Sequence, residues 1–198
     1  MRSFLTILVL SLALFACSSP SITPVTVPLQ YKTMVTPTEF PSAQSCAVVS
    51  RIDVADSRSD TATLGKRYLQ ERTSTTAPVT SSGDVAAWLR TGIEAALKQG
   101  GVAMSGSGPA LRVRLDSIKT DESVYRRAQY SGRVSMTAEL VSSSGRSCWH
   151  DSVEGYSENY GYAGSAENYR ETLNHALDRA MIRLLGSSGF KNAVCNCG

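Results

Sequence analysis

The sequence lacks the motifs that mark most enzymes. Its 198 residues include only two histidines, and no serine lies in a Gly-x-Ser-x-Gly elbow, so a hydrolase triad is not indicated. No glycine-rich loop follows a predicted strand and opens a helix, so the usual phosphate cradle is missing too. The net charge is only +3, and no basic run interleaves with aromatic residues. This balance argues against a nucleic-acid partner, and the densest basic spot is just Arg126-Arg127.

The two histidines are expected on different elements. His150 follows Trp149 on a predicted strand, whereas His175 lies at the edge of the apolar stripe of a predicted helix. Their separation gives no support to a shared catalytic site. We therefore expect no enzymatic activity and no cofactor, and a cell-wall hydrolase is the least favoured alternative.

The sequence also has no apolar run long enough to span a bilayer, which takes about 20 residues. Its one apolar run covers residues 4–15 and follows the basic Arg2. A basic start and an apolar core of this length are typical of a secretory signal. Loss of Arg2 with the signal would lower the net charge from +3 to +2.

The end of this run, Leu14-Phe15-Ala16-Cys17, resembles a bacterial lipobox. The resemblance implies that residues 1–16 are a lipoprotein signal peptide and that Cys17 is acylated, so that lipid anchors the chain to a membrane. Ser18 stands where lipoproteins retained at the inner membrane carry aspartate. By this resemblance, the absence of aspartate implies export to the periplasmic leaflet of the outer membrane. An ordinary secretory signal, cut after Ala16 without acylation, is the alternative.

Composition divides the mature chain into three parts. Five of the seven prolines fall in residues 17–45, which predicts an extended linker that holds the folded part away from the membrane. The apolar residues that alternate over 25–31 would allow a short edge strand in this segment. Residues 46–189 carry the periodic apolar pattern of one domain, and residues 190–198 are expected to be a loose tail unless a disulfide holds them.

Four cysteines remain beside Cys17, an even number that fits an oxidising compartment. Three pairings are open. Cys46 and Cys148 are expected on neighbouring strands, so we favour a bridge between them. The alternative ties Cys195 or Cys197 in the tail back to one of those two. The Cys-x-Cys pair has no CxxC partner and no histidine at ligand spacing, so we expect no metal site.

The periodicity predicts an α+β two-layer sandwich, with a mostly antiparallel sheet and two amphipathic helices on one face. The first strand is expected from Cys46 to Val54, with Val48, Ser50, Ile52 and Val54 on one face, and a Thr/Ser-rich loop from 72 to 83. The other elements are predicted as a helix from about 84 to 99, strands at 111–116, 125–141 and 146–160, and a helix from 166 to 185.

The order and spacing of several short motifs add a family resemblance. The chain resembles the YajG family of bacterial lipoproteins, which implies a periplasm-facing outer-membrane protein of envelope maintenance or assembly and supplies no catalytic residues. The motifs are Asp56-Ser57-Arg58-Ser59-Asp60, Gly65, Trp88-Leu89, Leu97, Gly101, Leu111-Arg112-Val113, Glu154-Gly155, Asn174 and Ala180. The four mature cysteines and the tail depart from that pattern.

Two segments are candidates for binding a partner. Tyr156, Tyr160 and Tyr162 cluster among glycines, and tyrosines on such a loop give contact area at low entropic cost. Ordinary packing at a strand end is the slightly preferred interpretation of these tyrosines. The second candidate is the turn from Asp56 through Arg58 to Asp60, which serves either as a binding loop or as a locally satisfied turn.

These observations favour a non-enzymatic, lipid-anchored binding or assembly module that docks to an envelope protein or polymer. Tethering raises the local concentration of such a module near partners in the same membrane. The alternative is an auxiliary lipoprotein subunit of an envelope transport or secretion complex. A free edge of the predicted sheet would also allow pairing with a second copy of the chain.

Overall fold

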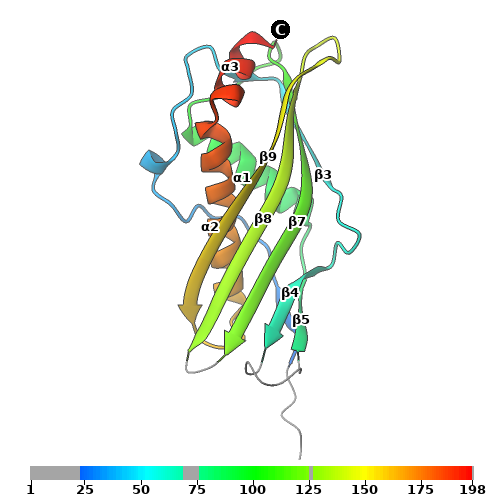
Figure 1. The fold of residues 1–198 in the computed structure, drawn as a ribbon, viewed down its shortest axis with the longest axis vertical. Coiled ribbons are helices and arrows are strands. Elements are labelled where there is room, and N and C mark those ends of the chain that lie inside the picture. Colours follow the sequence, from blue (N-terminus) through cyan, green and yellow to red (C-terminus); the bar gives the residue numbers. More distant parts are fainter. Residues whose placement is uncertain (1–22, 69–75, 125–126, 198) are drawn as a thin grey trace, which may run out of the picture.

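The computed structural model describes residues 23–68, 76–124 and 127–197, which form the predicted two-layer α+β sandwich (Figure 1). In chain order the elements are β1 (Val25–Val27), the 3-10 helix η1 (Pro37–Glu39), β2 (Val48–Val49), β3 (Arg51–Asp56), β4 (Thr63–Tyr68), β5 (Thr76–Ser81), α1 (Val85–Gln99), β6 (Ala103–Met104), β7 (Ala110–Val124), β8 (Ala128–Val141), β9 (Ser147–Gly161), α2 (Ala166–Gly186) and α3 (Ser188–Asn196).

The main sheet is built around three long antiparallel strands, β7, β8 and β9. Its order is β1-β5-β4-β7-β8-β9, and β3 pairs with β7 on the same side as β4. Both β3 and β4 run parallel to β7, β3 along its first half and β4 near its end. The strand β9 forms one edge of the sheet. A separate short parallel pair joins β2 to β6.

The helices cover one face of this sheet because its strands alternate apolar and polar residues. On β8 the even positions Tyr130, Val134 and Met136 are buried under α2. Each helix begins at a side-chain cap: Asp84 accepts from the backbone of Ala86 and Ala87 at the start of α1, and Ser165 caps α2.

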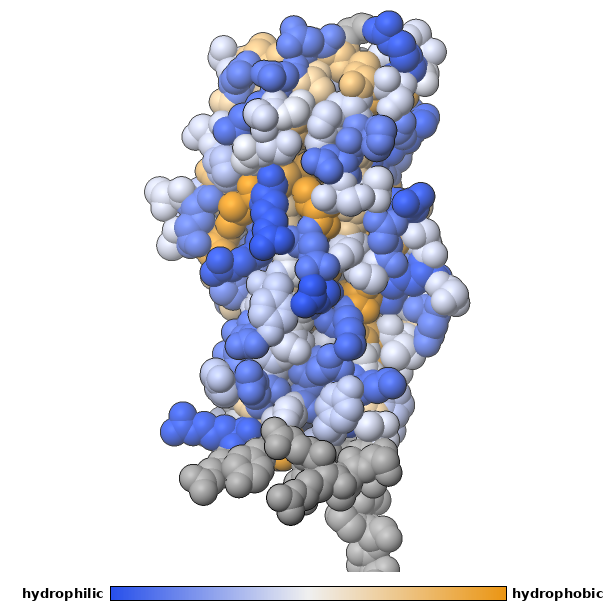
Figure 2. Space-filling model, in the orientation of Figure 1, coloured by the Kyte–Doolittle hydropathy of each residue, from blue (hydrophilic) through white to orange (hydrophobic). Residues whose placement is uncertain are grey.

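The opposite face of the sheet carries polar side chains and faces solvent. Figure 2 shows this face as mostly hydrophilic. Ion pairs cross it, among them Arg133 with Glu154, and Thr137 bonds both Asp116 and Ser152. A face of exposed, mutually paired charges is typical of a solvated surface rather than of a second core.

Residues 23–45 belong to the domain, so the linker expected over 17–45 does not extend into them. Within this segment Val27, Leu29 and Phe40 are buried. Strand β1 pairs with β5, which bears out the short edge strand left open at 25–31. The segment crosses α2, where Tyr31 donates to Asp178 at 2.5 Å and the backbone of Met34 donates to the same carboxylate at 2.6 Å.

Two further predictions differ from the structure. The strand predicted over 46–54 is divided at Ser50 into β2 and β3, which lie in different sheets. Val49 and Ile52 are buried, whereas Val48, which was predicted to share a face with Ile52, is half-buried. The Thr/Ser-rich stretch predicted as a loop over 72–83 contains β5. This strand pairs with β4 through its backbone, and Ala77 and Val79 supply the buried positions.

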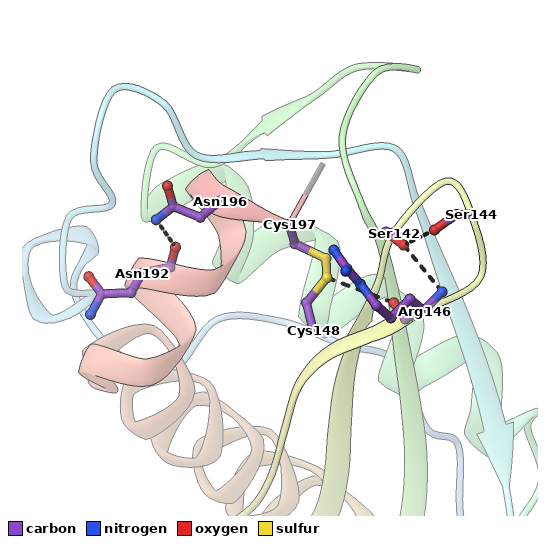
Figure 3. The surroundings of a disulfide bond; sticks show 7 residues. All are labelled: Ser142, Ser144, Arg146, Cys148, Asn192, Asn196 and Cys197. Carbon is purple, nitrogen blue, oxygen red and sulfur yellow. Dashed lines mark hydrogen bonds between the residues drawn. A yellow bond between two sulfur atoms is a disulfide. The ribbon is translucent and has the colours of Figure 1, made fainter.

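The C-terminal tail is a helix held by two disulfides. Phe190 and Val194 bury one side of α3. The bridges are Cys46–Cys195 and Cys148–Cys197, so the preferred Cys46–Cys148 pairing is wrong and the alternative, with the tail tied back, is correct. Figure 3 shows Cys197 meeting Cys148 beside the β8–β9 turn.

The strand order explains the correction. Cys46 lies just ahead of β2 and β3, and β7 and β8 separate β3 from β9, which carries Cys148. Three strand spacings amount to about 14 Å, whereas bridged Cα atoms lie within about 7 Å. Helix α3 contacts both β2 and β9. Cys195 in the helix and Cys197 just after its end reach one partner on each side.

Candidate functional site

A buried carboxylate organises the end of the sheet at which β4 and β9 finish (Figure 1). Glu122 on β7 is completely buried and pairs with Arg67 of β4, with 2.6 Å between Nε and Oε2. The hydroxyl of Tyr169 on α2 donates to the same oxygen at 2.6 Å, and the backbone N–H of Gly164 donates to the other at 2.7 Å. Four segments therefore meet at one side chain.

The tyrosine hydroxyls in this network remain donors. Burial, and then the hydrogen bond to Glu122, raise the pKa of Tyr169. Burial likewise raises the pKa of Tyr130, whose ring meets that of Tyr169 edge to face at 4.8 Å between centroids. Both phenols thus stay protonated at neutral pH, so that Tyr169 donates to the carboxylate and Tyr130 donates to the backbone of the adjoining turn.

This network holds the turn between β9 and α2. The Tyr130 hydroxyl donates to the carbonyl of Tyr162 and accepts from the backbone of Ser165 at 3.1 Å. Gly164 adopts a φ of 72°, a region that favours glycine. A Cβ there would also lie 2.9 Å from Nη2 of Arg67. The turn that carries Tyr162, at the end of the strand that carries Tyr156 and Tyr160, is therefore held in place by this buried network.

The three predicted tyrosines lie on or next to β9, and we call them the tyrosine surface. Tyr160 is 60% and Tyr162 89% exposed, so neither serves as core packing. Tyr156 is 39% exposed and points to the polar face, where Arg133 lies 5.3 Å from its ring centre and its hydroxyl bonds Glu158. Exposed, positioned aromatic rings are suited to binding.

The second predicted segment forms a closed turn. Arg58 makes a two-point ion pair with Asp56, at 2.6 and 2.9 Å, and donates to the carbonyls of Thr61 and Thr63. Asp60 accepts from the backbone of Ala62 and Thr63, both at 3.0 Å. Burial alone would raise the pKa of Asp56, but the hydrogen bonds from Arg58 outweigh it and hold the pKa below its usual value. These groups satisfy one another, which is the arrangement of a structural turn.

The remaining predicted residues are placed apart. His150 lies exposed on β9 and His175 is half-buried on α2, against the other face of the sheet. Cys17 and Arg126 lie outside the described residues. In the part of the chain that the structure describes, no three metal-ligating side chains gather at one point. None of the described helices combines the length and hydropathy needed to cross a bilayer.

Sequence reasoning missed Glu122 and Asp178, and it named Asn174 only as part of the family resemblance and not as a buried polar contact. Glu122 sits at a buried strand position, and Asn174 and Asp178 sit in the apolar stripe of α2. Asn174 accepts from the Trp88 indole at 2.8 Å and donates to the Gln30 carbonyl at 3.1 Å. A charged or amide residue at a core position was the available signal, since such groups are buried only with partners.

Comparison with known proteins gives a fold but no family assignment. No protein-family model and no curated protein matches the sequence. The fold is similar to that of protein XCC0632 from Xanthomonas campestris, of family DUF330, with a TM-score of 0.51 and 12% identity over 87% of this chain and 96% of that one. A minor lipoprotein from Acinetobacter baumannii aligns with a TM-score of 0.37 and 10% identity over 76% and 91%. Membership of the YajG family stays a prediction.

Proposed function

We propose that this chain is a lipid-anchored, non-enzymatic binding module of the bacterial envelope. In this proposal Cys17 carries the lipid, the anchor lies in the periplasmic leaflet of the outer membrane, and the domain docks to an envelope protein through the tyrosine surface. The observation that carries it is the tyrosine surface, three exposed aromatic residues at the end of β9 and on the adjoining turn that the buried Glu122 network fixes. A turn whose backbone is already held in place loses little backbone entropy on binding.

Tethering supplies the rest of the mechanism. A domain anchored in the same membrane as its partner meets it at a high effective concentration, so a small contact area is sufficient. The lipobox resemblance of residues 14–17 supports the anchor. The turn at Asp56 supports the tyrosine surface over that turn as the docking site, because Asp56 and Arg58 bond each other and Asp60 accepts from the local backbone.

A crosslinking capture from intact cells tests this function. The full-length protein is compared with a Tyr156→Ala/Tyr160→Ala/Tyr162→Ala variant and with Met104→Ala, a matched control whose side chain is 54% exposed on β6. We expect a discrete protein partner that the triple variant loses and the control keeps. Equal capture by all three proteins, or no reproducible partner, contradicts the docking role.

The free edge of β9 favours a second candidate, an auxiliary lipoprotein subunit of an envelope transport or secretion complex. This strand has 15 residues and pairs only with β8 among the described strands. An edge of this length can accept another strand and form a lasting interface. A partner that stays bound through purification without crosslinking supports this candidate, and self-association of the pure protein would assign the edge to a second copy.

A further inference from the structure

The start of the described chain lies at the same end of the molecule as residues 162–165, the turn between β9 and α2 that we call the tyrosine turn. The carbonyl of Thr23 accepts from Nη1 of Arg67 at 2.8 Å. The same guanidinium packs against Gly164, within the turn that carries Tyr162. In Figure 1 the arrowheads of β4 and β9 mark this end, and α3 and the C-terminus lie at the other.

The distance from the anchor to this end is short. Only six residue steps separate Cys17 from Thr23, and at about 3.3 Å per residue they span at most roughly 20 Å. A linker over the whole of 17–45 would have allowed several times this reach. Because the chain is already part of the fold at β1, the domain cannot move far from lipid attached to Cys17.

We propose that this end of the sandwich rests on the lipid surface, with Tyr160 and Tyr162 at the level of the headgroups. The inference rests on the lipid anchor of the proposed function and divides the tyrosine surface between two neighbours. Tyr160 and Tyr162 face lipid. Tyr156 lies on β9 four residues before Tyr160, about 13 Å away along the strand, and stays available to a protein.

The chemistry of this end suits a headgroup layer. Tyrosine has an apolar ring and a polar hydroxyl, and it is enriched where membranes meet water. Tyr160 and Tyr162 are the most exposed aromatic residues among those described. Arg127 is exposed just before Ala128, which pairs with Gly161, so a cation also lies at this end and favours anionic headgroups.

The test places a fluorescent reporter at each end of the lipidated, full-length protein. The Tyr162→Trp variant marks the tyrosine turn, and Met104→Trp marks the exposed residue of β6 as a matched control. Both are reconstituted into vesicles of phosphatidylethanolamine and phosphatidylglycerol that contain lipid brominated near the top of the acyl chain. The emission of the parent protein is subtracted from that of each variant, which removes the contribution of the native Trp88 and Trp149. Vesicle flotation is measured first.

We expect the added emission of the Tyr162→Trp variant to be quenched by brominated lipid and that of Met104→Trp to be retained. Flotation without quenching of either variant, or equal quenching of both, overturns the inference and leaves the anchor intact. Failure of the protein to float contradicts the anchor itself and hence the proposed function. A protein partner lost on Tyr160→Ala/Tyr162→Ala but kept by Tyr156→Ala would assign this end to protein rather than lipid.

Discussion

Arg67 and Glu122 form an ion pair in which the carboxylate is completely buried and the guanidinium is almost covered, with side-chain exposures of 0% and 13%. The pair joins β4 to β7. Through Thr23, Gly164 and Tyr169 it also reaches the segment just before β1, the tyrosine turn and α2. One charge pair thus fixes the geometry of the end that carries the candidate site.

Replacing Arg67 should destabilise the protein strongly. Arg67→Ala leaves the Glu122 charge buried without its partner, which typically costs about 3–5 kcal/mol of unfolding free energy. The matched control is Arg133→Ala, which breaks a solvent-exposed pair with Glu154 and should cost about 1 kcal/mol or less. Urea denaturation of both variants measures the difference. Similar losses in the two variants would show that Glu122 does not depend on this pair.

Gly155 on β9 is required by the close approach of α2. A Cβ at this position would lie 1.8 Å from the carbonyl oxygen of Ala176 and 2.5 Å from the backbone nitrogen of Ala180. Because backbone cannot move aside as a side chain does, Gly155→Ala should cost at least about 1–3 kcal/mol, the usual range for overpacking. Gly106→Ala is the control, since nothing lies within 4 Å of its Cβ position. Thermal melts compare them, and an unchanged melting temperature for Gly155→Ala contradicts this packing.

The buried carboxylate of Asp178 predicts a pH dependence. Burial raises its pKa in the folded state, and the hydrogen bonds from Tyr31 and Met34 offset this only in part. The folded protein therefore holds this proton more tightly than the unfolded chain. The associated stability is fully present below the ordinary value of about 4 and is lost as the pH rises through the folded-state pKa.

Asp178→Asn removes this titration. The unfolding free energy of the wild type minus that of the variant should fall as the pH is raised from about 4 toward neutral. Denaturant titrations of both proteins at a series of pH values give this difference directly. A difference that stays constant or grows with pH would contradict the raised pKa.

The two disulfides should contribute unequally. They close segments with sequence separations of 149 and 49 residues. Removing either should cost about 2–5 kcal/mol, and the loop-entropy relation makes the longer one worth about 1 kcal/mol more. Denaturation of Cys46→Ser/Cys195→Ser and Cys148→Ser/Cys197→Ser measures this order. Peptide mapping of the oxidised protein checks the pairing, and recovery of a Cys46–Cys148 peptide would contradict it.

Periodicity predicted the fold class and both long helices, because their buried positions recur regularly along the chain. The stripe of α1, from Val85 to Leu97, is buried as expected. The long strands β8 and β9 were found for the same reason; β8 is described from Ala128, and the predicted start near Tyr125 lies outside the described residues. Alternation of apolar and polar residues over many positions leaves few other structures open.

Long-range partners account for what could not be predicted. Residues 25–40 have the proline content of a linker, yet they are ordered by Asp178 and Asn174, which lie more than 140 residues away in the sequence. The Thr/Ser-rich β5 is a strand because β1 and β4 pair with its backbone. The tyrosine surface was predicted from composition, but the Glu122 network beneath it depends on four separate segments.

Mass spectrometry of the mature N-terminal peptide, isolated from membranes, tests whether lipid at Cys17 anchors the chain. We expect a peptide that begins at Cys17 and carries acyl chains, and we expect a Cys17→Ser variant to leave the membrane fraction. A peptide that begins at an unmodified Cys17, or one that retains residues 1–16, would contradict the lipid anchor and the tethered recognition built on it.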